Sequence, residues 1–142
     1  MSVIRVKMFI ALAQSQPFTP SRSINDYEAI LSAKPANQPT MPVYHVALFK
    51  LKPEADPNKV KQWQALAEGM VGQVPGLIGL QAGAPIALTA PMAKGFDMGV
   101  VVHLDYVESL ATFFTHPSHE EVNELYKDVC EMGSTIGYDI EF

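Results

Sequence analysis

The order of the apolar segments after residue 42 is the feature that most constrains what this chain can fold into. Segments that alternate or run apolar in the manner of strands are separated by segments with helical spacing. The expected elements are a strand over 43–51, a helix over 56–76, strands over 77–84 and 96–106, a short helix over 107–114, a helix over 118–132 and a strand over 137–142. This order is that of the ferredoxin-like split βαβ motif, so we predict an α+β protomer with an antiparallel four-stranded sheet.

Both faces of the first expected strand are apolar. Along it, one face would present Val43, His45, Ala47 and Phe49, and the other Tyr44, Val46 and Leu48. The helices of this motif cover one face of the sheet, so the second apolar face needs a cover of its own. We therefore predict a homodimer in which two such sheets face each other.

The chain changes character near residue 41. Residues 14–42 are rich in Pro, Ser, Gln and Asn and lack strand or helix periodicity, as in a linker or irregular coil. We therefore place the folded domain at 41–142 and interpret 1–40 as an N-terminal extension or linker. Residues 1–25 contain Arg5 and Lys7 but no acidic residue, so an organellar targeting segment, a disordered extension and an added strand all stay open.

Charge and composition argue against several function classes. The formal net charge is −5 and the basic residues are scattered, so we expect no nucleic-acid surface. No apolar run approaches the roughly 20 residues of a membrane span. The single cysteine, Cys130, is expected to be an inert thiol inside the last helix and suits a reducing, cytoplasmic compartment. Neither zinc-ligand spacing nor a phosphate loop is found, so we expect no metal and no cofactor.

Residues 113–122, Phe-Phe-Thr-His-Pro-Ser-His-Glu-Glu-Val, place two histidines around a Pro-Ser pair. Ser118 and Glu121 match a capping box, which predicts Ser118 as the N-cap and His119 at the first helical position. The positive end of a helix disfavours a charged imidazole, so His119 is expected to be neutral and able to accept a proton. His116 precedes a proline, and we expect an extended backbone and a structural role there.

Four stretches, 44–55, 74–83, 94–122 and 138–142, together resemble the stress-responsive dimeric α+β-barrel family. The most specific of them are His-Val-Ala-Leu-Phe-Lys, which begins at His45, and the His-Pro-Ser-His turn. The resemblance covers the chain from about residue 41 to its end. It implies a ferredoxin-like protomer whose sheet pairs with that of a second copy to form a barrel.

The family includes a plant polyketide cyclase, which forms olivetolic acid with a histidine base and no cofactor. Carried over by position, its catalytic histidine falls on His119 and its first-strand pocket histidine on His45. The tyrosine that holds its base matches Phe113, and a third-strand histidine matches Met98, so two polar positions are apolar in this chain. The resemblance thus implies a pocket whose wall includes His45, Ala47, Phe49, Met98, Phe113 and His119.

Three functions follow as hypotheses. The two apolar replacements favour a stress-associated dimer whose cavity binds a hydrophobic metabolite or nothing, without catalysis. The alternative is a cofactor-independent cyclase or isomerase for a polyketide-like substrate, in which His119 removes a proton and His45 polarises a carbonyl. A cofactor-free monooxygenase is the third and rests on analogy of fold alone. Purely architectural histidines are the competing interpretation of the same residues.

Overall fold

A computed structural model describes residues 41–142, and the predictions for residues 1–40 lie outside the described part of the chain. The strands are β1 (Val43–Phe49), β2 (Leu77–Gly83), β3 (Met98–Leu104) and β4 (Ile136–Glu141). The helices are α3 (Pro57–Glu68), α4 (Ser109–Thr115) and α5 (Pro117–Val129), and a single 3-10 turn, η1, spans Ala90–Ala93.

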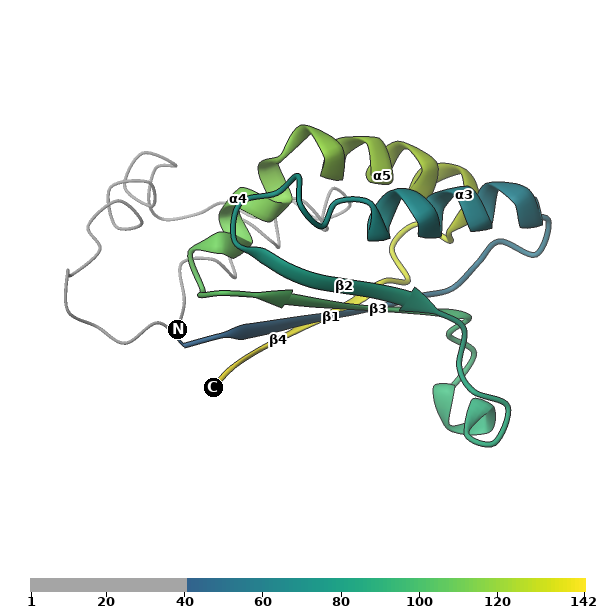
Figure 1. The fold of residues 1–142 in the computed structure, drawn as a ribbon. Helices are drawn as coiled ribbons and strands as arrows, with labels where there is room; N and C mark the ends of the chain where they lie inside the picture. The colour runs from purple at the N-terminus through teal and green to yellow at the C-terminus, as the bar shows by residue number, and fades with distance from the viewer. Residues whose placement is uncertain (1–40) are drawn as a thin grey trace, which may run out of the picture.

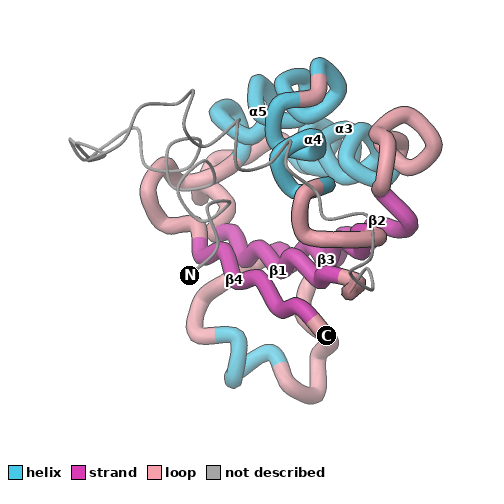
Figure 2. The backbone as a smooth tube through the Cα atoms, turned by 90° about the vertical axis from the view of Figure 1, so that its left-hand side faces the viewer, coloured by secondary structure: helices cyan, strands magenta, loops and turns pink. Residues whose placement is uncertain are grey.

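The four strands form one antiparallel sheet in the order β2-β3-β1-β4. All three helices lie on one face of this sheet, and α3 packs beside α5 (Figures 1 and 2). The predicted ferredoxin-like α+β fold with a four-stranded antiparallel sheet is therefore confirmed. In this order β1 and β3 are central, so side chains from both strands face the helical layer.

The core lies between the sheet and the helices. On β1, Val43, His45 and Ala47 are buried, and alternate residues of β3 from Met98 to Leu104 are buried as well. This is the face predicted from the alternation of the sequence. Trp63 and Ala67 of α3 and Phe113 of α4 complete the same cluster from the helical side.

Helix α3 begins as predicted and ends earlier than predicted. The Asp56 carboxylate accepts a hydrogen bond from the Asn58 amide at 2.8 Å, and Pro57 occupies the first turn. The helix ends at Glu68, and the residues up to Gly76 form turns rather than helix. Gly69 closes the last turn by donating its amide to the Ala65 carbonyl at 2.9 Å.

The start of helix α5 differs from the prediction. His116, and not Ser118, is the N-cap: the His116 backbone is extended and its Nδ1 accepts from the Ser118 amide at 3.2 Å. Pro117 then takes the first helical position, which suits its fixed φ and its missing amide hydrogen. His119 consequently sits two residues further into the helix than the capping-box pattern indicated.

The end of helix α5 also differs. Cys130 was expected inside the helix, but the helix ends at Val129 and Cys130 adopts an extended backbone as its C-cap. There it forms an antiparallel bridge with Leu51. Its thiol is buried, and burial raises its pKa to about 12, so the expectation of an unreactive thiol fits this environment.

Within residues 41–142 no helix covers the opposite face of the sheet, and we call it the open face. By strand register and exposure it presents a largely apolar set that comprises Tyr44, Val46, Leu48, Val101, His103, Ile136, Tyr138 and Ile140. The connection between β2 and β3, which contains η1, projects on this same side (Figures 1 and 2). It carries the exposed side chains of Ile86, Leu88 and Met92.

Candidate functional site

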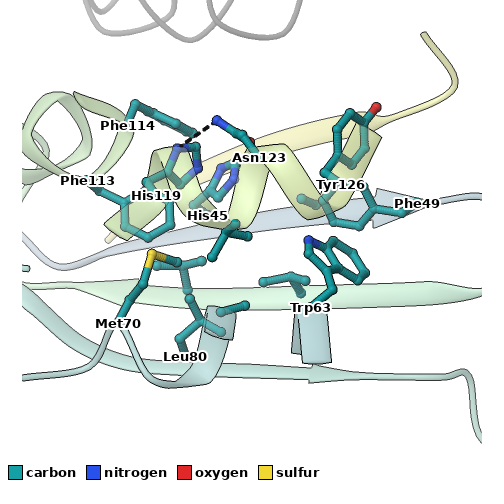
Figure 3. A pocket seen from close by; sticks show the side chains of 15 residues that line it. His45, Phe49, Trp63, Met70, Leu80, Phe113, Phe114, His119, Asn123 and Tyr126 are labelled. Atoms are coloured by element: carbon teal, nitrogen blue, oxygen red, sulfur yellow. Dashed lines mark hydrogen bonds between the residues drawn. The ribbon is translucent and has the colours of Figure 1, made fainter. Parts of the chain in front are cut away.

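A cavity lies between the helical face of the sheet and the three helices (Figure 3). Its water-accessible volume is about 60 Å³, enough for several water molecules at roughly 10–15 Å³ each. The wall is mostly apolar, and its residues are His45, Ala47, Phe49, Trp63, Ala67, Met70, Leu80, Val100, Val102, Phe113, Phe114, His119, Val122, Asn123 and Tyr126. A mostly apolar hollow with a few polar groups is the usual form of a small-molecule site.

Five of the six residues predicted for the pocket wall lie in it: His45, Ala47, Phe49, Phe113 and His119. Met98 is the exception, and for this residue the prediction was wrong. It is buried at the start of β3, where it pairs with Phe49 at the end of the strand away from His45. Its side chain therefore belongs to the core beyond the cavity.

His45 is held by a carboxylate from the edge strand. Its Nδ1 lies 2.8 Å from Oδ1 of Asp139, which faces it in the β1–β4 register. His45 is only 4 % exposed, whereas the Asp139 side chain keeps 20 % of its surface accessible. An ionised carboxylate only accepts hydrogen bonds, so Nδ1 of His45 donates and its Nε2 carries the free lone pair.

His119 has a different hydrogen-bond partner, and its Nδ1 accepts the hydrogen bond instead of donating it. The Asn123 side-chain nitrogen, one helical turn further along α5, donates to Nδ1 of His119 at 3.1 Å (Figure 3). Since Nδ1 accepts, the proton of the neutral ring is on Nε2. Among residues 41–142, neither Nε2 of His119 nor that of His45 makes a hydrogen bond.

The surroundings of His119 keep it uncharged. Burial and, to a smaller extent, the nearby His45 lower the pKa of His119 to about 4. Phe113 and Phe114 contact both imidazoles edge-on or at a tilt, with centroid distances between 4.8 and 6.1 Å. The neutral state agrees with the sequence prediction, but its causes are burial and a second histidine instead of the helix end.

Two polar residues of the site were missed by the sequence analysis. Asn123 follows His119 by four residues on one helix, a spacing that could have indicated the contact. Asp139 faces His45 only because β4 pairs with β1 in one particular register, which no local pattern specifies.

The other two histidines lie elsewhere. His116 caps α5, and its Nδ1 lies 2.7 Å from the Ser118 hydroxyl oxygen. His103 is on the open face, stacked on Tyr44 with ring centroids 4.6 Å apart. Neither residue lines the cavity.

Within 41–142, no group of three or more His, Cys, Asp or Glu side chains is arranged to hold a metal ion. No helix in that range is long and apolar enough to cross a lipid bilayer.

The fold and the cavity define a small α+β protein whose helices enclose a histidine-bearing apolar hollow. The family model described as "Stress responsive A/B Barrel Domain" matches residues 43–142. The chain belongs to this family, as the resemblance of its sequence motifs implied. No curated protein sequence matches the chain.

Solved structures of similar fold come from bacteria and a plant. A dimeric ferredoxin-like protein of unknown function from Thermobifida fusca is 20% identical, with a TM-score of 0.61, and the match covers 76% of this chain and 97% of that one. A second such protein, from Jannaschia sp., is 17% identical with a TM-score of 0.63, covering 71% and 99%. The hydroxynitrile lyase from Passiflora edulis is 17% identical with a TM-score of 0.63, covering 73% and 95%. At these identities the likeness establishes the shared fold.

Proposed function

We propose that the cavity catalyses a cofactor-free proton transfer on a small, largely apolar carbonyl compound, in a lyase, cyclase or isomerase reaction. The observation that carries this proposal is the opposite hydrogen-bonding of two histidines at one cavity. His45 offers a lone pair from a ring fixed by Asp139, and His119 offers a proton from a ring fixed by Asn123. Figure 3 shows the two rings together on the same side of the cavity.

His45 is the general base in this proposal. Its Nε2 removes a proton from the carbon next to the carbonyl or from a hydroxyl group of the substrate. Asp139 then stabilises the imidazolium that forms and holds the ring in the tautomer that leaves Nε2 free. His119, uncharged and protonated on Nε2, donates a hydrogen bond to the substrate oxygen on which negative charge develops. These roles are the reverse of those expected from the sequence.

Typical magnitudes indicate how much of the rate acceleration each group can supply. General base assistance contributes about 10²–10⁴-fold, or roughly 3–5 kcal/mol of barrier. The remainder of a useful acceleration must come from positioning of the substrate and from the donor on His119. The apolar wall favours both effects because a low local dielectric strengthens the electrostatic interactions inside the cavity.

The comparisons support a chemical role without naming the reaction. One protein of the same fold is described as a hydroxynitrile lyase, so in that protein the fold serves a small-molecule enzyme. The resemblance to a polyketide cyclase points to the same class of proton chemistry. Both precedents are compatible with a base and a donor at one cavity.

Binding of a hydrophobic metabolite without catalysis is the second candidate. It is favoured by Phe113, which packs on His119 at 4.8 Å without a hydroxyl group, at the position where the cyclase has a tyrosine. In this case the histidines would serve only to hold the oxygen of a bound ligand.

We further propose that the protein works as a homodimer joined through the open face. Tyr138 and Phe142 are 60 % and 54 % exposed there, an unfavourable state for large apolar side chains in a monomer. Two solved structures of the same fold are described as dimeric. Pairing two open faces would leave both cavities on the outer, helical sides of the dimer.

Two simple compounds test the catalytic proposal. Phenylacetone has acidic hydrogens beside its carbonyl, and their exchange in D₂O is followed by NMR; mandelonitrile tests the lyase reaction through release of benzaldehyde. We expect the protein to accelerate at least one reaction and His45→Gln to reduce that acceleration by about 10²–10⁴-fold. His116→Asn, which retains a side chain able to cap α5, should leave the rate unchanged. Saturable binding with no turnover of either compound would favour the second candidate instead.

A further inference from the structure

Trp63 carries the one buried polar side-chain atom without a partner in the described part of the chain. It is the only tryptophan of the protein and is 2 % exposed. Its indole Nε1 has no hydrogen-bond acceptor among residues 41–142. Buried side-chain donors in native proteins are nearly always paired, so an unpaired one calls for a specific explanation.

The indole group belongs to the cavity wall. Trp63 lies on the buried side of α3, and its ring meets Phe49 edge-on at a centroid distance of 5.0 Å. Figure 3 shows its nitrogen turned toward the side on which His45 lies. The nitrogen edge of the indole is therefore turned to the cavity side of Trp63, although Nε1 itself is buried.

None of the polar side chains that line the cavity accepts this hydrogen bond. Tyr126 also packs on Phe49, but its hydroxyl is bonded to Oγ1 of Thr135 at 2.7 Å. The histidines and Asn123 lie toward the opposite end of the cavity (Figure 3). An oxygen atom of a bound molecule can accept the hydrogen bond that the indole N–H does not make within residues 41–142.

We propose that the Trp63 indole N–H is a specificity-determining donor that binds an oxygen atom of the ligand at the end of the cavity away from the histidines. This proposal rests on the proposed function, because it assumes that the cavity takes a small molecule. It adds a second point of recognition: one ligand oxygen faces His119, and another faces Trp63. The apolar wall between them contacts the carbon skeleton.

The cavity wall also indicates the charge of that oxygen. The lining contains no lysine or arginine, and the Nδ1 atoms of its two histidines already face Asp139 and Asn123. A carboxylate or phosphate group in this hollow would lose its hydration without gaining a cation. The ligand oxygen at Trp63 therefore belongs to a neutral carbonyl, ether or hydroxyl group.

A matched pair of small ketones separates the two recognition points. 1,4-Cyclohexanedione has an oxygen at each end, whereas 4-methylenecyclohexanone replaces one of them with a carbon group of similar shape. Because the protein has a single tryptophan, its indole N–H gives one assignable signal in a ¹H–¹⁵N spectrum. We expect the dione to bind about 3- to 10-fold more tightly than the methylene ketone and to move this signal downfield.

Trp63→Phe provides the control. It retains an aromatic ring but removes the donor, so the dione should lose its advantage while both ketones lose a similar amount of packing. Equal binding of both ketones to the unaltered protein, with the indole signal unmoved, would overturn the role of Trp63 and leave the proposed function standing. If neither ketone perturbs the NMR signals of His45, His119 or Trp63, both proposals are contradicted.

Discussion

Nδ1 of His45 lies 2.8 Å from Oδ1 of Asp139, although 94 residues separate them in the chain. The contact exists because β4, the last strand, pairs antiparallel with β1 and places Asp139 opposite His45. The sheet therefore assembles the pair before any ligand binds. A carboxylate that orients an imidazole in this way is a familiar means of activating a histidine base.

Substitution of the carboxylate tests its role in the proposed reaction. Asp139→Asn keeps the size of the side chain but removes the charge that would stabilise a protonated His45. We expect about a 10²-fold or greater fall in kcat with phenylacetone or mandelonitrile, whichever is turned over. Asp128→Asn is the matched control, because Asp128 pairs only with Lys59 at the surface. Its rate should stay unchanged, and equal loss of activity in both variants would contradict the pairing role of Asp139.

The lowered pKa of His119 predicts a stability that depends on pH. The unfolded chain binds a proton at a pKa near 6.5, whereas the folded protein holds His119 neutral down to about pH 4. Between these values the unfolded state binds more protons, so the free energy of unfolding falls as the pH falls through this window and levels off below it. The full effect is roughly 3 kcal/mol.

His119→Gln isolates this contribution, since glutamine is polar and does not titrate. Urea denaturation from pH 7 to pH 4 should show a smaller loss of stability in the variant than in the unaltered protein. Identical pH profiles for the two proteins would mean that His119 is not held neutral by its surroundings.

A second stability prediction concerns the turn before β2. Gly76 has φ of +83°, and a Cβ added there would lie 2.3 Å from the Ser109 Oγ and 2.7 Å from the Asp105 Oδ1. Gly76→Ala should therefore lower the free energy of unfolding by about 3 kcal/mol, combining backbone strain and a clash. Gly72 has a similar φ of +88° but no atom within 4 Å of an added Cβ, so Gly72→Ala should cost only about 1 kcal/mol. Equal costs in urea denaturation would argue against the close packing at Gly76.

The open face provides a test of assembly. Val101 lies at the centre of the open face, where it is 44 % exposed and pairs with Val46 across the sheet. If two open faces pack together, Val101→Arg buries an unpaired charge twice in a symmetric dimer and should weaken association by 100-fold or more. Met132→Arg, at an exposed position outside the sheet, should leave association unchanged. If sedimentation analysis finds the unaltered protein to be a monomer, the proposed dimer is contradicted.

The sequence predicted the fold better than the site because strand alternation and the helix start at Asp56 are local signals. The element order and the buried faces of β1 and β3 follow from such patterns. The predicted helix boundaries were less accurate. Helix α5 begins at Pro117 and not after a Ser118 cap, because proline suits the first helical position. Of the site, the two histidines followed from the family motifs, while Asp139 depends on a register set by the whole sheet.

Met98 shows a further limit. Its face of β3 follows from the alternation of the sequence, but how far along the sheet the cavity extends does not, and the cavity ends before Met98. Trp63 packs in the core cluster as its place on a helix face would predict. Only the three-dimensional structure reveals that its indole nitrogen has no hydrogen-bond partner among residues 41–142.

The most direct test of the account is the protonation state of the two cavity histidines, measured by long-range ¹H–¹⁵N correlation NMR on protein labelled at its four histidines. The signals are assigned with His45→Gln and His119→Gln. We predict that His119 is uncharged at neutral pH with its proton on Nε2, and that His45 carries a proton on Nδ1. A charged His119 at neutral pH, or a proton on Nδ1 in both rings, would contradict it.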